Sequence, residues 1–184
     1  MDFFALAQAC APMVDPATLA AIVRTESAFR PWSIGINGGA RLKKQPSSKE
    51  EAVSIAKDLI SRGYSIDMGL GQINSANLAR LGITVEKVFD PCMNLAAAGT
   101  ILHENYLSAL KNGQTQQHAL QSALSAYNTG SFTRGVSNGY VQRVRHSAGY
   151  SGPVPVPAAH KKTNRAETGT PRQDTFTKTV MVYP

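Results

Sequence analysis

Apolar residues recur at helical spacing between residues 14 and 31 and predict a helix with a clear start. Asp15 is a typical N-cap residue, and Pro16 suits the first helical position because its missing N–H has no helical partner there. The apolar stripe that follows consists of Leu19, Ile22 and Val23. The next position of the i, i+3, i+4, i+7 series is Glu26, so a carboxyl group stands where a core residue is expected.

Glu26 needs an explanation, because an unpaired buried charge is so costly that the group usually becomes neutral. Three structural explanations are open: the carboxylate pairs with a buried arginine, it lies at a helix end that has reached solvent, or the helix is shorter than the pattern indicates. The functional explanation is a carboxyl group held protonated for acid catalysis. The rest of the chain is needed to choose among them.

Similar periodic patterns continue to about residue 150. Further helices are predicted over residues 47–63, 75–81, 90–111, 115–130 and 138–150. Ser47 and Ser48 each stand three residues before a Glu, which is the capping-box pattern of a helix start. Residues 68–74, MGLGQIN, contain two glycines and lack a helical period, so we expect an extended or turning loop there. The expected fold is mainly α, with at most a small β element near residues 64–74.

The composition changes after residue 150. Residues 151–184 are rich in Pro, Thr and Lys and poor in large apolar side chains, so they cannot bury enough surface to offset chain ordering. We therefore expect one domain over residues 1–150 and a flexible tail over residues 151–184. The PVPVP run in the tail suggests a docking peptide, and an inert terminus is the alternative.

Length and charge narrow the function only a little. The chain has 184 residues, of which 42% are hydrophobic, and this suits one proper core. Its net charge of +7 is spread along the chain and is not gathered with aromatic residues into a stripe, so a nucleic-acid partner is not expected. Loose attraction to an anionic polymer fits better. The four histidines, His103, His118, His146 and His160, have no spacing that suggests a metal site.

The two cysteines and the first residues bear on the cellular compartment. In an oxidising compartment Cys10 and Cys92 would close a loop of about 80 residues, which stabilises by roughly 4–5 kcal/mol on the chain-entropy model. Two buried free thiols are the alternative. The first twelve residues, MDFFALAQACAP, have no basic region, so no clear signal peptide is predicted. No stretch reaches the ~18 continuous apolar residues of a membrane-spanning helix.

Five short motifs occur in a fixed order along the chain. They are ESAFRP at 26–31, MGLGQIN at 68–74, NLAAAGTIL at 94–102, SAYNTG at 125–130 and YVQRV at 140–144. Over about residues 5–150 this set resembles the soluble-lytic lytic transglycosylases, which have a goose-lysozyme-like fold. It is most similar to those of type IV secretion and conjugation systems. An inserted basic loop over residues 37–46 and the helix after it, together with Gly71 and Asn74, depart from the pattern of many members.

The resemblance implies a substrate and a reaction. The substrate is the glycan strand of peptidoglycan, cleaved without water at the MurNAc–GlcNAc β-1,4 bond with formation of 1,6-anhydroMurNAc, and no cofactor or metal is needed. Glu26 is then the single catalytic acid and base, assisted by the N-acetyl group of the substrate. Asp67 and Glu104 are the candidates for a second carboxylate, and we expect neither to be a nucleophile. A lysozyme-type hydrolase and an inactive peptidoglycan-binding scaffold of the same fold are the alternatives.

The resemblance also assigns substrate-binding roles. These fall on Ser27, Met68, Gly69, Leu70, Gln72, Tyr127, Asn128 and Tyr140. The phenol of Tyr127 is expected to point toward the acid. Each of three residues has a structural alternative. Ser27 is then only a hydroxyl at a helix end, Tyr127 a core residue and Tyr140 a packing residue. A peptidoglycan substrate implies the periplasm, with components of a type IV secretion system as partners, in contact with the tail.

Overall fold

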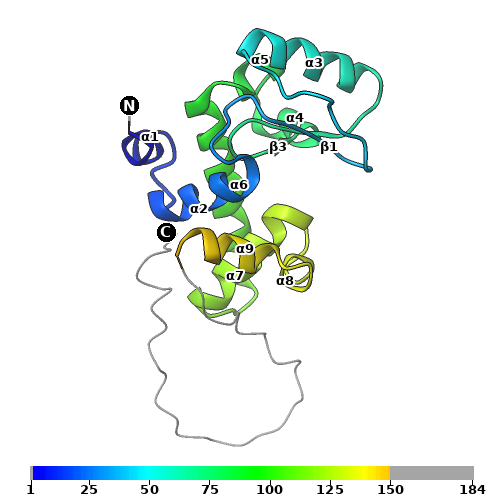
Figure 1. The fold of residues 1–184 in the computed structure, drawn as a ribbon. Coiled ribbons are helices and arrows are strands. Elements are labelled where there is room, and N and C mark those ends of the chain that lie inside the picture. The colour runs from blue at the N-terminus through cyan, green and yellow to red at the C-terminus, as the bar shows by residue number, and fades with distance from the viewer. Residues whose placement is uncertain (1, 150–184) are drawn as a thin grey trace, which may run out of the picture.

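The computed structural model describes residues 2–149, and these are mainly helical (Figure 1). The longer helices are α1 (Phe3–Cys10), α2 (Pro16–Ser27), α3 (Lys49–Ser61), α6 (Pro91–Lys111), α7 (Gln116–Thr129) and α9 (Tyr140–Ser147). Single turns form the 3-10 helix η1 (Ser75–Asn77) and the helices α4 (Leu78–Leu81), α5 (Val85–Val88) and α8 (Arg134–Ser137). The tail expected over residues 151–184 lies outside the described residues, so the division into domain and tail stays a prediction.

The helix starts follow the local signals in the sequence. Asp15 accepts hydrogen bonds from the backbone N–H groups of Ala17 and Thr18 at 2.8 and 3.2 Å, as its N-cap position predicts. Ser48 Oγ accepts from the N–H of Glu51 at 3.2 Å, and Glu51 Oε2 accepts from the N–H of Ser47 at 2.7 Å. The N-cap at Ser48 is thus as expected and begins α3, while the Glu51 carboxylate bonds the residue before the N-cap, so the capping box forms in a variant shifted by one residue.

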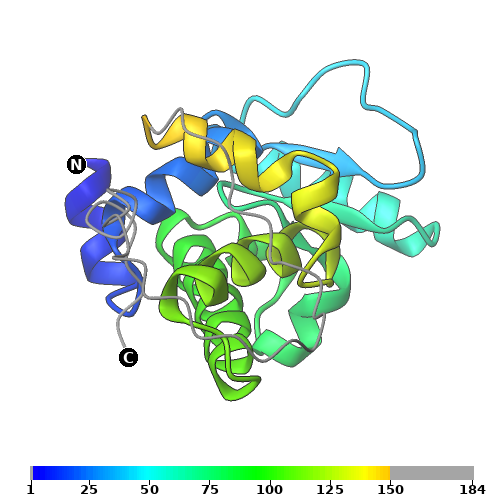
Figure 2. The same ribbon diagram turned by 90° about the horizontal axis from the view of Figure 1, so that it is seen from below.

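The core is built around α6. Its buried face contains Leu95, Ala98, Leu102 and Tyr106, the inner stripe expected from the sequence. Helix α7 packs along α6, α1 packs against both α2 and α6, and α9 lies beside α2 (Figure 2). Cys10 at the end of α1 and Cys92 in the first turn of α6 are joined by a disulfide bond, so the N-terminal helix is covalently tied to the central one. No helix within residues 2–149 is long and apolar enough to cross a membrane.

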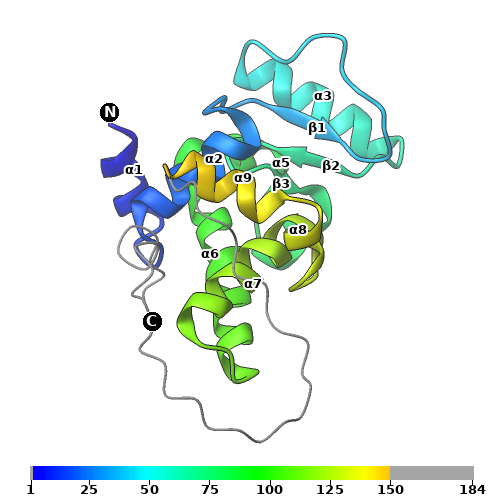
Figure 3. The same ribbon diagram turned by 60° about the horizontal axis from the view of Figure 1, so that its bottom comes forward.

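A small antiparallel sheet of order β1-β2-β3 lies above α7 in the view of Figure 3, toward the upper end of α6. The strands are β1 (Ile34–Ile36), β2 (Ile66–Met68) and β3 (Ile73–Asn74). Residues 64–74 thus contain the expected β element, but the sequence did not predict the edge strand β1. That strand is only three residues long and is held by pairing with the distant β2 and by Gln45, whose amide bonds both the N–H and the C=O of Ile34 at 2.8 and 2.9 Å. The single-turn helices α5 and α8 were missed because they are too short to show a period.

Candidate active site

The side chain of Glu26 leaves the apolar stripe at the end of α2. Leu19, Ile22 and Val23 are fully buried, as their helical spacing predicts. One turn later Glu26 is half-buried and faces a cleft of about 390 Å³. Among residues 2–149 it makes no ion pair, which removes the buried-arginine explanation. The helix ends one residue further on, at Ser27.

Tyr140 is the hydrogen-bond partner of Glu26. It is the first residue of α9, it is 2% exposed, and its hydroxyl donates to Glu26 Oε1 at 2.6 Å. Burial raises the pKa of the Tyr140 phenol well above its usual range, so this hydroxyl keeps its proton and remains a donor. The packing of α9 beside α2 therefore fixes one oxygen of the carboxyl group.

The surroundings of Glu26 favour its protonated form. Burial raises the pKa of Glu26 to about 7, and the nearby charge of Asp67 raises it as well. The hydrogen bond from Tyr140 and the charge of Arg143 act in the opposite direction. Because the raising effects win, a large fraction of Glu26 carries a proton near neutral pH, as a general acid requires.

Asp67 is the second carboxylate of the cleft. Side chains alternate along β2, so Ile66 and Met68 enter the core while Asp67 points to the opposite face. The amide of Asn74 donates to its Oδ1 at 2.7 Å and that of Asn37 to its Oδ2 at 3.0 Å. Burial raises the pKa of Asp67, and the two amide hydrogen bonds lower it.

The hairpin that follows β2 forms one wall of the cleft and is anchored by Asn94. This buried amide donates to the C=O groups of Met68 and Val88 at 2.9 and 2.7 Å and accepts from the N–H of Gly71 at 2.7 Å. The chain passes so close that a Cβ at Gly69, whose φ is +78°, would lie 2.2 Å from the Asn94 amide nitrogen. The hairpin therefore requires glycine where it crosses α6.

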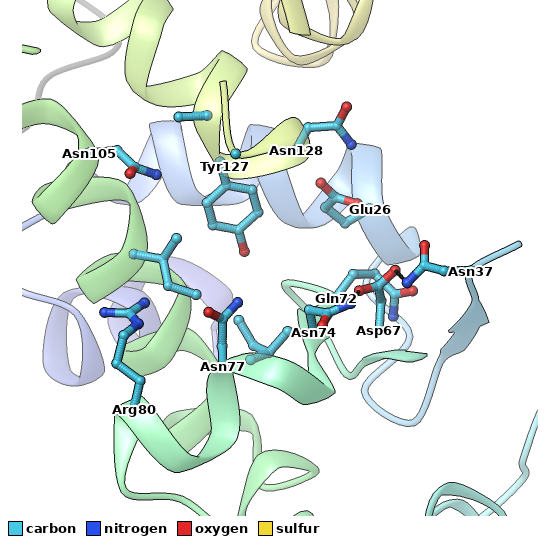
Figure 4. Close-up of a pocket in the computed structure, with 14 residues that line it drawn as sticks. Glu26, Asn37, Asp67, Gln72, Asn74, Asn77, Arg80, Asn105, Tyr127 and Asn128 are labelled. Carbon is cyan, nitrogen blue, oxygen red and sulfur yellow. Dashed lines mark hydrogen bonds between the residues drawn. The ribbon is translucent and has the colours of Figure 1, made fainter. Parts of the chain in front are cut away.

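Tyr127 and Asn128, near the end of α7, face this hairpin across the cleft (Figure 4). The Tyr127 hydroxyl donates to the C=O of Gly71 at 2.6 Å, so it ties α7 to the hairpin. Asn128 is exposed, and its Oδ1 accepts from the amide of Asn138 at 3.1 Å. The cleft is thus closed on one side by the sheet and on the other by α7.

Residues 3–147 match the family model described as the transglycosylase SLT domain. The chain belongs to this family. The SLT domain is lysozyme-like and mainly α, so the expected fold class and the expected relationship are both confirmed.

Relatives of this SLT domain carry the name virB1, and the Brucella relatives are named as type IV secretion system proteins. "Type IV secretion system protein virB1" of Brucella suis biovar 1 (strain 1330) is 44% identical over 154 residues, which cover 80% of this chain and 64% of the relative. "Protein virB1" of Agrobacterium fabrum (strain C58 / ATCC 33970) is 38% identical over 169 residues, with 91% and 67% covered. "Protein virB1" of Rhizobium radiobacter is 40% identical over 151 residues, with 80% and 61% covered. The chain therefore spans somewhat under two thirds of several of these relatives. No solved structure matches it.

The structure brings only some of the expected site residues into the cleft of the SLT domain. Glu26, Gln72, Tyr127 and Asn128 line it, and Tyr140 reaches it through its contact with Glu26. The phenol of Tyr127 bonds the hairpin backbone and makes no hydrogen bond to Glu26. The amide nitrogen of Gln72 is likewise occupied, because it donates to the C=O groups of Ser33 and Gly69 at 3.1 and 2.9 Å.

The other expected substrate residues face away from the cleft. Ser27 is 1% exposed, and its hydroxyl donates to the C=O of Val23 at 3.2 Å, which is the alternative of a hydroxyl at a helix end. Met68 and Leu70 are core residues, 0% and 5% exposed, because the alternation along the hairpin turns them inward. Gly69 is packed against Asn94. These four support the wall of the cleft and do not line it.

Several lining residues were not predicted from the sequence. They are Asn37, Ile73, Asn74, Asn77, Arg80, Ile101, Asn105, Ala126 and Gly130. The asparagines come from the loop after β1, from β3, from η1 and from α6, so no local pattern marks them. Within residues 2–149 no cluster of three or more His, Cys, Asp or Glu side chains is arranged to hold a metal ion.

Proposed function

We propose that this chain is a peptidoglycan lytic transglycosylase that cleaves the β-1,4 bond between MurNAc and GlcNAc. The observation that carries the proposal is one carboxyl group, Glu26, with a pKa of about 7 in a cleft lined by carboxamides. Carboxamides donate and accept hydrogen bonds at once, which suits the hydroxyl and acetamido groups of an amino sugar. Membership of the SLT family supports the same activity.

The proposed mechanism uses Glu26 twice. Protonated Glu26 gives its proton to the glycosidic oxygen, and the carbonyl oxygen of the MurNAc acetamido group attacks C1 as the bond to the leaving GlcNAc breaks. The Glu26 carboxylate then takes the proton of the C6 hydroxyl, whose oxygen displaces the acetamido oxygen at C1. The products are a new GlcNAc end and a 1,6-anhydroMurNAc end, and Glu26 is protonated again.

Tyr140 and the hairpin have supporting roles in this proposal. Tyr140 holds Oε1 of Glu26 and thereby aims the other carboxyl oxygen, while Tyr127 ties α7 to the hairpin and sets the width of the cleft. Gln72 offers its amide oxygen to sugar hydroxyls, because its amide nitrogen is already bonded, and Asn128 offers its N–H groups. Ser27, Met68, Gly69 and Leu70 act on the substrate only through the shape of this wall.

A specific observation favours a second candidate, the lysozyme-type hydrolase. Asp67 lies in the same cleft as Glu26, and glycosidases that use water or a covalent intermediate need two carboxyl groups. Incubation of the purified protein with sacculi, followed by mass spectrometry of the released fragments, separates the two reactions. Anhydro ends, lighter by one water, support the transglycosylase, whereas reducing ends show hydrolysis. The absence of soluble fragments would refute both.

The inactive-scaffold alternative is tested by Glu26→Gln. This nearly isosteric change removes the acid and keeps the shape of the cleft, so an enzyme loses glycan release while sugar binding remains. Thr25→Ser on the neighbouring helical position is a matched control because it keeps a hydroxyl and leaves the cleft untouched. Unchanged glycan release by Glu26→Gln would favour the scaffold.

We also propose that this activity opens the cell wall locally for a type IV secretion or conjugation apparatus, and that the protein works in the periplasm. The name of the Brucella relative, type IV secretion system protein virB1, supports this setting, and the disulfide between Cys10 and Cys92 fits an oxidising compartment. Contact between the tail, residues 151–184, and components of the apparatus is part of the proposal. Conjugation or secretion assays with Glu26→Gln and with the tail deleted test the two parts separately.

A further inference from the structure

Asn138, in the turn between α8 and α9, connects the start of α9 to the end of α7. Its Oδ1 accepts from the backbone N–H of Tyr140 at 2.9 Å, and its Nδ2 donates to Asn128 Oδ1 at 3.1 Å. Asn128 lines the cleft, and the hydroxyl of Tyr140 bonds Glu26. Asn138 does not line the cleft itself, so it acts on a bound sugar only through its neighbours.

The backbone of Asn138 is held in place on both sides. Its N–H donates to the C=O of Arg134 at 3.0 Å, and its C=O accepts from Arg143 Nη1 at 3.3 Å. The next residue, Gly139, has a φ of +78° and turns the chain into α9, a conformation that favours glycine. The Asn138 side chain therefore projects from a fixed point, although it is exposed.

The hydrogen bonds determine which way both amide groups face. A carboxamide has an oxygen that accepts and an NH₂ group that donates. The N–H of Tyr140 only donates, so the oxygen of Asn138 faces it and the nitrogen of Asn138 faces Asn128. That nitrogen also only donates, so Asn128 turns its oxygen to Asn138. Among residues 2–149 no hydrogen bond uses the Nδ2 of Asn128, which lies on the side of Glu26 in Figure 4.

We propose that Asn138 is a positioning residue that makes the cleft selective for N-acetylated sugars, because it fixes the amide of Asn128 with its N–H groups toward the substrate. This inference rests on the proposed function, since it concerns a sugar bound beside Glu26. A sugar hydroxyl both donates and accepts, so it fits either orientation of the amide. An acetamido carbonyl oxygen only accepts and a protonated amine only donates, so these two groups respond to the orientation.

Asn138→Asp should reverse the amide of Asn128. One carboxylate oxygen keeps the contact with the N–H of Tyr140, and Asp is a favoured residue at a helix start, so α9 is retained. The other carboxylate oxygen only accepts. Asn128 must then turn its nitrogen toward residue 138 and its oxygen toward the cleft, where the oxygen repels an acetamido carbonyl and attracts an amine.

Calorimetry with two tetrasaccharides measures the effect without catalysis. One is the tetramer of N-acetylglucosamine and the other is the tetramer of glucosamine, at a pH at which its amines are protonated. The preference is the Kd of the glucosamine tetramer divided by that of the acetylated tetramer. We expect Asn138→Asp to lower this ratio by about tenfold relative to the wild-type protein. A ratio that stays constant or rises would overturn the proposal.

Two controls separate the orientation of the amide from the added charge. Ser137→Asp places the same charge at the neighbouring exposed position, which does not line the cleft, and it should lower the preference by less than about twofold. In an Asn128→Ala background, Asn138→Asp should lower the preference no more than Ser137→Asp does, because no amide is left to turn. An equal loss in Asn138→Asp and Ser137→Asp would mean that the charge alone acts, and the proposal would be wrong.

The same measurements distinguish this inference from the proposed function. If the wild-type protein binds neither tetramer and releases no glycan from sacculi, the proposed function fails, and the role of Asn138 fails with it. If the wild-type protein binds the acetylated tetramer and Asn138→Asp keeps the wild-type preference, only the role of Asn138 is refuted. Binding of the glucosamine tetramer by Asn138→Asp at least as tightly as by the wild-type protein shows that the variant is folded.

Discussion

Removal of the Tyr140 hydroxyl should raise the pKa of Glu26. The phenol donates to Glu26 Oε1 at 2.6 Å and stabilises the ionised carboxylate more than the neutral acid. Tyr140→Phe keeps the buried ring and deletes only this donor. The carboxylate then loses its main stabilising contact, so the protonated form persists to higher pH.

The magnitude follows from the energy of one hydrogen bond. A hydrogen bond to a charged group is worth about 1.5–3 kcal/mol, and one pKa unit equals about 1.4 kcal/mol. Because the hydroxyl also bonds the neutral carboxyl and water replaces part of the lost contact, we expect a rise of about one unit from the wild-type value of about 7. The first step needs protonated Glu26, so kcat/KM is high below this pKa and is lost as the pH rises through it. In the profile of kcat/KM against pH, the basic limb should therefore move to higher pH. The plateau of the profile should fall, because the carboxyl group of Glu26 is oriented less well.

The assay is the release of soluble glycan from sacculi as a function of pH, analysed as kcat/KM, which reports the free enzyme. Tyr64→Phe is the matched control, because Tyr64 also lies near an arginine, with its ring centroid 5.3 Å from Arg62 Cζ, but is exposed and does not line the cleft. It should leave the limb in place. A Tyr140→Phe limb at or below the wild-type pH would refute the role of this hydrogen bond.

Three further changes test the charges and the covalent link. Glu26→Gln should lower glycan release by at least about 10²–10⁴-fold, and retention of activity in the sacculus assay would contradict the assignment. Asp67→Asn removes a charge that raises the pKa of Glu26, so the basic limb of kcat/KM should move to lower pH, opposite to Tyr140→Phe; an upward shift would contradict this. Replacing Cys10 and Cys92 by serine removes a link across 82 residues and should lower the free energy of unfolding by about 4–5 kcal/mol on the chain-entropy model. Urea unfolding of the oxidised wild-type protein is the reference. Equal unfolding midpoints for the variant and the wild-type protein would show that the disulfide does not stabilise the fold.

Local signals in the sequence were sufficient for the longer helices from α2 onward, whereas α1 and the single-turn helices α5 and α8 were not predicted. The caps at Asp15 and Ser48, the stop at Gly130 and the period of the apolar residues act within one or two turns, so their effect is independent of the rest of the chain. The helical spacing that predicts Glu26 on the inner side of α2 is also a local property, and the folded structure keeps it. The ordered motifs were sufficient to recognise the SLT family.

The composition of the cleft was decided by tertiary structure. Ser27 and Leu70 belong to the family motifs, but their side chains are buried in the core. Asn77 and Asn105 belong to none of these motifs and line the cleft. The strand β1 forms only where β2 offers it partners.

The contact with Glu26 is the clearest case. A sequence places Tyr140 on a helix, but only the packing of α9 beside α2 brings its hydroxyl to a carboxyl group 114 residues away. The pKa of Glu26 depends on the same packing, because desolvation comes from every element that closes around the side chain. Periodicity along the chain determines which way a side chain leaves its own helix, whereas its neighbours depend on long-range packing that no local pattern encodes.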